Sequence, residues 1–279
     1  MAALVLARRA RMYIGAPLLT SAAFAATIGG AAAEPRKAGD TVATRWQLGA
    51  TPLPLRKDGF GLAFPTPPPL RDRRLPTIDR LPPPLSGGFE FTVRPAEHAL
   101  QAGMPPVAAD CPVGVSDLAY LALSFWGFDA RPHTGELVVH RRVAQDIVRV
   151  FARLYASRFP IEEMRLTTAA DIAAPPTGDG NNTAAFLCRG ALGQQDRHRR
   201  WSSHAYGVAI DINPFQNPYR YGSLLLPELA FAYTDRKWRR PGMIQAGDVV
   251  THSFADIGWA WGGTWTSRLD YMHFSETGE

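Results

Sequence analysis

The sequence predicts an α+β domain, and three observations carry this prediction. Residues 141–159 (RRVAQDIVRVFARLYASRF) place apolar side chains at helical spacing, and Pro160 should end this helix. Short apolar segments on either side of the helix have the length and composition of strands. Stretches rich in Gly, Pro and Asn separate them. One early helix followed mainly by strands is typical of the α+β class.

The N-terminal half of the domain, up to residue 183, is expected to contain strands before and after the helix and then a loop. We expect strands at 88–95 (GFEFTVRP) and 117–128, the second running into a turn at Gly127. Residues 135–140 (GELVVH) fit either a strand or the start of the helix. A further strand is expected at 161–166, and residues 169–183 are expected to form a loop because of their Pro, Gly and Asn content.

The C-terminal part begins with a strand whose apolar residues alternate from Tyr206 to Ile212. A polar loop should follow at 213–222, and residues 249–263 predict a short helix that ends at a glycine turn. The last expected strand is 269–275 (LDYMHFS).

The N-terminal residues 1–33 have the layout of a secretory signal peptide. Arg8, Arg9 and Arg11 precede an apolar run, and three alanines at 31–33 offer a cleavage site. The alternative is a membrane anchor, although the apolar run is short for a span and rich in Ala, Gly and Thr. The Arg8–Arg9 pair suggests twin-arginine export, but the residues after it fit that signal poorly. We therefore expect an exported chain, membrane-tethered if the leader is not cleaved.

Two further segments complete the expected organisation. Residues 34–87 are a proline-rich linker, because proline at this density favours extended, semi-rigid chain. Residues 88–279 form the domain.

Charge and cysteine content limit the classes of protein. The formal net charge of +5 includes the three leader arginines, so the chain without its leader is near +2. No basic run interleaved with aromatic residues is present, and we expect no nucleic-acid partner. No stable protein partner is implied either. Cys111 and Cys188 are the only cysteines. They would be unrelated thiols in a cytosolic enzyme, but one even pair suggests a disulfide in an exported chain.

Two histidines and two carboxylates stand out from the rest of the sequence. Asp211 ends an apolar strand, where an uncompensated carboxylate would be costly to bury. His204 precedes it by seven residues, and Asp270 precedes His273 by three. Two imidazoles and a carboxylate can hold zinc and leave a fourth position open for water. Seven is an odd number, so His204 must lie in a turn before the strand, or the strand must bulge near Gly207.

The segment from Ser202 to Ile212 (SSHAYGVAIDI) resembles the S-x-H-x-x-G-x-A-x-D-I signature of the VanY-like zinc peptidases, which are D-alanyl-D-alanine carboxypeptidases, dipeptidases and L-alanyl-D-glutamate endopeptidases of cell walls. The acid-x-x-His pattern of that family is matched by residues 270–273 (DYMH). The resemblance covers about residues 88–279. Leu187 and Met272 depart from it, because polar residues are expected there.

The resemblance implies a hedgehog/DD-peptidase-like fold, in which a small antiparallel sheet with flanking helices carries the zinc site on its face. It implies one Zn²⁺ per chain, with His204, Asp211 and His273 as ligands. Asp270 would be the general base or acid. Arg189 would meet the substrate's carboxylate or the developing oxyanion, and Ser202 would hydrogen-bond the substrate.

The function implied is an exported, cell-wall-associated carboxypeptidase acting on peptidoglycan stem peptides. Cleavage between L-Ala and D-Glu, a non-catalytic wall-binding module and an amidase for another amide are the alternatives. The histidine in THSF, His252, is expected to cap or pack rather than to join the site. Trp259, Trp261 and Trp265 are expected to pack around the Gly262–Gly263 turn, with a sugar-binding groove as the alternative.

Overall fold

The structure is a computed structural model, and it describes residues 47–192 and 200–278. The expected leader, residues 1–33, lies outside the described residues. None of the described helices combines the length and the apolar character needed to span a bilayer.

The described residues form small sheets and short helices, as the expected α+β class requires. The α-helices are α1 Glu97–Gln101, α2 Ala144–Ala156, α3 Ala169–Ala173 and α4 Val249–Ala255. The 3₁₀ turns are η1 Pro68–Leu70, η2 Val115–Asp117, η3 Arg141–Val143, η4 Ser203–Tyr206, η5 Phe231–Thr234 and η6 Gly262–Thr264. The strands are β1 Phe91–Pro95, β2 Leu118–Trp126, β3 Pro132–His140, β4 Glu163–Met164, β5 Asn182–Thr183, β6 Ala209–Asp211, β7 Tyr219–Tyr221, β8 Leu224–Leu226, β9 Ala260–Trp261, β10 Leu269–Asp270 and β11 His273–Ser275.

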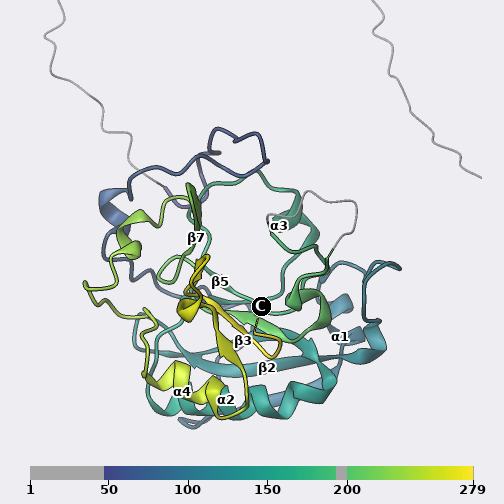
Figure 1. The fold of residues 1–279 in the computed structure, drawn as a ribbon. Coiled ribbons are helices and arrows are strands. Elements are labelled where there is room, and N and C mark those ends of the chain that lie inside the picture. The colour runs from purple at the N-terminus through teal and green to yellow at the C-terminus, as the bar shows by residue number, and fades with distance from the viewer. Residues whose placement is uncertain (1–46, 193–199, 279) are drawn as a thin grey trace, which may run out of the picture. The chain divides into compact units, whose positions relative to one another are not determined.

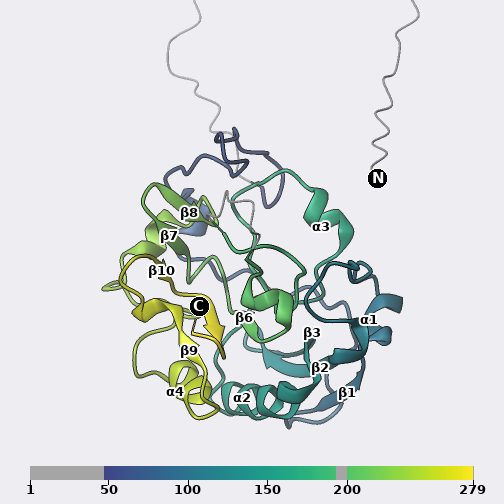
Figure 2. The same cartoon turned by 45° about the vertical axis from the view of Figure 1, so that its right-hand side comes forward.

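Among the described residues, the strands form three antiparallel sheets and one parallel pair. The sheets have the orders β1-β2-β3, β10-β7-β8 and β6-β11-β9, and β4 pairs with β5 in parallel. Figure 1 shows α2 and α4 beside each other at the end of the domain below β2 and β3. Figure 2 shows α3 toward the opposite end of the same domain.

The main core joins helix α2 to the strands that carry the site. Ile147, Phe151 and Leu154 lie on one face of α2 and are fully or almost fully buried. They belong to the same apolar cluster as Ile210 of β6 and Phe274 of β11. The helical spacing in residues 141–159 therefore produced the helix predicted from it, which begins with η3 and ends before Pro160. Its apolar face anchors the sheet that presents the polar site.

Several expectations about local structure are confirmed. The strands expected at 88–95 and 117–128 are β1 and β2, and residues 135–140 belong to strand β3 rather than to a helix. Residues 161–166 contain β4, and α4 forms where the short C-terminal helix was expected. Cys111 and Cys188 form the suggested disulfide, with their Cα atoms 5.9 Å apart.

Other local expectations are wrong. The expected loop at 169–183 contains α3, because the Thr168 and Asp171 side chains accept from each other's backbone N–H groups and cap the first turn. The expected loop at 213–222 contains β7, and the expected strand at 269–275 is divided into β10 and β11. Tyr206 belongs to η4 and not to the strand.

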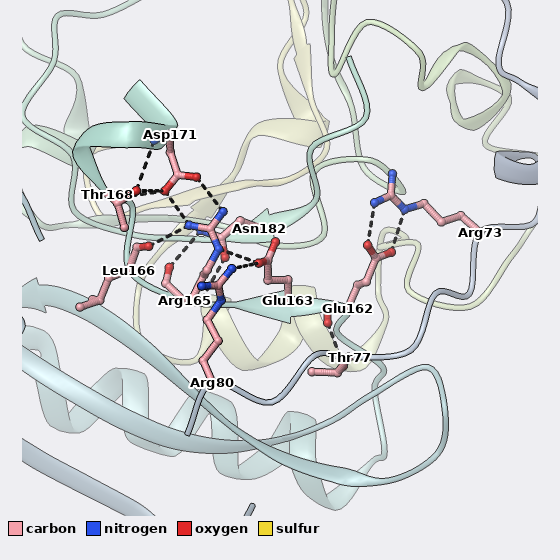
Figure 3. A network of polar contacts seen from close by, with 10 residues as sticks. All are labelled: Arg73, Thr77, Arg80, Glu162, Glu163, Arg165, Leu166, Thr168, Asp171 and Asn182. Atoms are coloured by element: carbon pink, nitrogen blue, oxygen red, sulfur yellow. Dashed lines mark hydrogen bonds and ion pairs between the residues drawn. The ribbon is translucent and has the colours of Figure 1, made fainter. Parts of the chain in front are cut away.

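The described part of the proline-rich segment, residues 47–87, has irregular backbone apart from η1 and the bridge between Leu55 and Gly61. It contacts the domain closely. Leu70 is fully buried, and Arg73 is 2% exposed and forms an ion pair with Glu162, as Figure 3 shows. The described residues, 47–192 and 200–278, belong to one compact unit. The expected division at residue 87 stays a prediction.

Candidate metal centre

His204 lies in the turn before its strand, which is the first of the two arrangements that the odd spacing allowed. The turn is η4, whose first backbone groups are capped by the Ser202 hydroxyl, 3.4 Å from the His204 amide nitrogen. It ends at Gly207, which has a φ of 68°. A Cβ atom at Gly207 would lie 2.5 Å from the His140 amide nitrogen, so only glycine fits this corner. The turn holds the imidazole of His204 in the interior, 4% exposed.

Asp211 and His273 are brought together by strand pairing. Strands β6 and β11 are antiparallel, and their register puts His273 directly opposite Asp211. Directly opposite residues project from the same face of a sheet, so the two side chains meet. His273 Nδ1 is 3.0 Å from Asp211 Oδ1, and His204 Nε2 is 3.2 Å from Asp211 Oδ2. The two ring nitrogens, His204 Nε2 and His273 Nδ1, are 3.2 Å apart.

The donor atoms of these three residues are spaced as zinc ligands are, with Asp211 offering Oδ1 to His273 and Oδ2 to His204. Tetrahedral zinc has ligand distances of about 2.0–2.2 Å for nitrogen and oxygen, so two of its ligands lie about 3.3 Å apart. The separations of 3.0–3.2 Å within the cluster are close to that value. Two imidazoles and one carboxylate also match the donor types that zinc prefers. The cluster can therefore hold a metal ion.

The far side of each imidazole has its own partner. His204 Nδ1 is 2.6 Å from the carbonyl oxygen of Ala185, and His273 Nε2 is 3.3 Å from Ser203 Oγ. A nitrogen that donates outward leaves the other nitrogen of the ring free to bind a metal. Sequence reasoning missed both partners. A backbone carbonyl carries no residue signal, whereas Ser203 could have been suspected from its place beside His204.

The electrostatic environment of the cluster is dominated by burial and by mutual contact. Burial lowers the pKa of His204, which favours the neutral imidazole that a metal requires. Burial by itself would raise the pKa of Asp211, but the adjacent His204 and His273 lower it overall, so the carboxylate is ionised. Burial also opposes protonation of His273, yet the hydrogen bond to Asp211 raises its pKa.

Asp270 lies beside the cluster but is not part of it. It ends β10, opposite Tyr219 of β7, and its carbonyl group lies against Gly262, where a Cβ atom would come within 2.7 Å. Among the described residues, no hydrogen-bond partner reaches its Oδ1 atom, which is buried. Burial raises the pKa of this carboxyl to about 7, although His273 opposes the shift. Such a group can exchange a proton near neutral pH.

A cleft of about 350 Å³ opens onto these residues. Its walls contain His204 and His273 of the cluster, together with Asp270, Arg189 and Ser202. The remaining lining residues are Ala191, Leu192, Arg200, Trp201, Ser203, Tyr206, Tyr219, Trp265, Arg268 and Thr277. All five of the named residues are therefore brought to one cavity, next to Asp211.

Arg189 belongs to an irregular segment that is tied to η4. The Leu187 amide donates to the His204 carbonyl, and the Ser202 amide donates to the Arg189 carbonyl. The disulfide at Cys188 adds a covalent tie. The Arg189 guanidinium donates to the Gly190 carbonyl at 3.3 Å, and its positive charge acts on His204 and Asp270. The structure thus fixes this arginine at the edge of the cluster.

His252 and two of the three tryptophans lie outside the cleft, whereas the third tryptophan lines it. His252 is exposed on α4 and does not line the cleft. Trp259 is packed in the main core against Phe254, and Trp261 stacks on Phe274. Trp265 differs from these two, because it lines the cleft.

Comparison with known proteins identifies a family that resembles the C-terminal part of the chain. No match is found among curated proteins or among solved structures. Residues 195–276 match the family described as D-alanyl-D-alanine carboxypeptidase, and this segment contains His204, Asp211, Asp270 and His273. The resemblance expected from the sequence is therefore confirmed over residues 195–276.

Proposed function

We propose that this chain is an exported, zinc-dependent D-Ala–D-Ala carboxypeptidase that acts on peptidoglycan stem peptides. The observation that supports this function most strongly is the convergence of His204, Asp211 and His273 beside Asp270, where one cleft opens. The family match over the same residues supports the peptidase class.

In this proposal, His204, Asp211 and His273 hold one zinc ion per chain. Zinc lowers the pKa of a bound water from 15.7 to about 7 and polarises a carbonyl oxygen. Asp270 is the general base and then the general acid. Its carboxylate accepts a proton from the attacking water and its carboxylic acid returns that proton to the leaving amine. A pKa raised by burial suits both halves of this cycle.

Arg189 is proposed to bind the free carboxylate of the terminal D-Ala or to stabilise the oxyanion. Its planar fork can donate two parallel hydrogen bonds to a carboxylate. Ser202 lines the cleft and is proposed to hydrogen-bond the substrate through its hydroxyl, which also caps η4. Removal of Ser202 would therefore change the fold of the turn as well as binding.

The proposal includes the location and the organisation of the chain. Residues 1–33 are proposed as a secretory signal peptide, or as a tether if they are retained, which gives an extracytoplasmic protein. Residues 34–87 are proposed as the linker and 88–279 as the peptidase domain, with the zinc site on the face of the small β6-β11-β9 sheet.

A digest of purified muropeptides tests the proposed reaction. Mass spectrometry should show loss of a single alanine from pentapeptide stems, and a chelator should abolish that loss. Products cut between L-Ala and D-Glu would assign the endopeptidase activity instead. Retention of the chain on peptidoglycan with no new amine released would identify a binding module and contradict the proposal.

A further inference from the structure

The cleft is lined by more arginines than the proposed reaction requires. Among the described residues, three of the cleft's lining residues are arginines, namely Arg189, Arg200 and Arg268, and one, Asp270, is acidic. Arg189 lies near the histidines and has a proposed role. Arg268 immediately precedes β10 and has not been assigned one. An excess of guanidinium groups around a peptide-sized cleft indicates an anionic ligand.

Arg268 is held in place by an aromatic ring. Its guanidinium carbon lies 4.4 Å from the centre of the Trp265 ring. The Trp265 ring is in turn 5.5 Å from the His273 ring. Stacking on tryptophan orients a guanidinium group through its face and leaves its N–H donors at the edge free for other partners.

Within the part of the chain that the structure describes, those donors have no hydrogen-bond partner. Among residues 47–192 and 200–278, no carboxylate or carbonyl accepts a hydrogen bond from the Arg268 side chain, which is half-buried in the cleft wall. Its charge acts on Asp270 and Tyr219 through space rather than through a hydrogen bond. A half-buried, oriented arginine with free donors is suited to a carboxylate supplied by a ligand.

The two ring distances also limit how far the Arg268 guanidinium lies from the histidine cluster. The guanidinium of Arg268 lies no more than about 10 Å from the His273 ring, because Trp265 contacts both. An extended peptide covers that distance with about three residues. A substrate whose scissile bond lies at the cluster can therefore place its third residue from that bond at Arg268.

We propose that Arg268, stacked on Trp265, is a specificity-determining residue that binds a second carboxylate of the substrate, about three residues from the scissile bond on its acyl side. The inference rests on the proposed function, in which Arg189 meets the first carboxylate beyond the scissile bond. The preferred substrate is then a peptide with two carboxylates, one on each side of the bond that is cut.

A pair of synthetic peptides that differ only in charge tests this specificity. Acetyl-Glu-Lys-D-Ala-D-Ala has a carboxylate three residues before the scissile bond, and acetyl-Gln-Lys-D-Ala-D-Ala has an uncharged amide of the same shape. The zinc-loaded full chain should cleave the Glu peptide with a kcat/KM about five- to tenfold higher, as expected for one partly exposed ion pair. The difference should lie mainly in KM and should shrink as salt is added.

Three variants make the assignment specific. Arg268→Gln should remove the preference while cleavage of the Gln peptide continues. Arg268→Lys should keep part of it, since lysine retains the charge but lacks the planar fork. The matched control is Arg149→Gln, because Arg149 is exposed on α2, pairs with Asp146 and does not line the cleft. It should keep the full preference.

The inference is overturned if the wild-type chain does not distinguish the two peptides, or if Arg268→Gln keeps the preference. Failure of the proposed function has another signature, namely that neither peptide is cleaved by the wild-type chain. In that event calorimetric binding of the same peptides to the full chain decides the inference. Tighter binding of the Glu peptide that is lost in Arg268→Gln supports it, and equal binding contradicts it.

Discussion

His273 faces Asp211 across the antiparallel pair of β11 and β6, with its Nδ1 atom 3.0 Å from the aspartate Oδ1. This contact gives a partner to a carboxylate that would otherwise be costly to desolvate. His204 completes the set from the turn before β6. The three side chains are therefore positioned by backbone pairing and by a capped turn.

Ser203→Ala should weaken metal binding through its effect on His273. The Ser203 hydroxyl is the partner of His273 Nε2, and loss of such a partner typically lowers metal affinity by about 10- to 100-fold. A chelator competition measures the zinc affinity. Ser202→Ala is the matched control. It removes the cap of η4, which costs about 1 kcal/mol of stability, and should change zinc affinity less. Equal zinc affinity in Ser203→Ala and the wild-type chain would argue against a positioning role for Ser203.

Asp270→Asn should separate metal binding from turnover. The amide has the same shape as the carboxyl but cannot exchange the catalytic proton, so kcat should fall by about 10²- to 10⁴-fold. Zinc content should not change, because Asp270 lies outside the ligand cluster. Steady-state kinetics and metal analysis of the same sample check both statements. Loss of zinc together with activity would show that Asp270 is a ligand rather than a base.

Arg73→Ala should strongly destabilise the domain. Arg73 donates to Glu162 at 2.6 and 2.8 Å and to the Asp179 carbonyl at 2.7 Å, and removing it leaves the buried Glu162 without its counter-charge. The expected loss in free energy of unfolding is about 3–5 kcal/mol, measured by urea unfolding. Arg153→Ala is the control, because Arg153 forms an exposed ion pair with Asp256, and it should lose less than about 1 kcal/mol.

The Arg73 measurement also tests how the proline-rich segment acts. If residues 47–87 were only a spacer, Arg73→Ala would cost no more than the exposed control. A large difference would show that this segment stabilises the folded domain, and a chain starting at residue 88 should then be unstable as well.

Acid should destabilise the chain partly through Asp171. Figure 3 shows Asp171 with Arg165 and Thr168, whose hydrogen bonds lower the pKa of Asp171 to about 2 against the opposing effect of partial burial. A carboxyl with a pKa depressed in the folded state stabilises that state above its unfolded pKa of about 4. This stabilisation is lost as pH falls toward 2. Asp171→Asn should cost about 1 kcal/mol at pH 6, after discounting for exposure, and almost nothing at pH 2. Urea unfolding at both values measures this, and a cost independent of pH would contradict the assignment.

Reduction of the disulfide should affect both stability and substrate binding. The bond between Cys111 and Cys188 spans 77 residues of sequence, for which chain entropy gives a stabilisation of at most about 4.5 kcal/mol. Arg189 follows Cys188 directly, so the Cys111→Ala/Cys188→Ala variant should also raise KM more than it lowers kcat. Thermal unfolding and kinetics of the double variant measure the two effects. An unchanged KM would show that the backbone bonds of the Arg189 segment suffice to position it.

The parts of the fold that were predictable are those with a strong local pattern. The α2 helix followed from its apolar spacing and from Pro160, and β2 from its long apolar run. The short strands β5 and β7 were hidden inside polar, proline-containing stretches, because tertiary pairing rather than composition makes them strands. The α3 helix was missed, although the Thr168-x-x-Asp171 pattern is that of a capping box.

The residue types of the candidate site were predictable from the sequence, but the contacts that position these residues were not. The spacing of His204 and Asp211 left two arrangements open, and only the structure distinguishes the turn from the bulge. The carbonyl of Ala185 approaches His204 because of a bridge between Ala184 and Asp211, which no sequence pattern encodes. The role proposed for Arg268 likewise depends on its stacking on Trp265, which is a tertiary contact.

Metal content tests the central claim most directly. The full chain, supplied with zinc and then passed through a desalting column, should retain about one zinc per chain by elemental analysis. His273→Ala should retain almost none while its circular dichroism stays that of a folded protein, and His252→Ala, which alters an exposed histidine outside the cleft, should retain the wild-type amount. A wild-type chain without zinc, or a His273→Ala variant that binds as much as the wild type, would contradict the account.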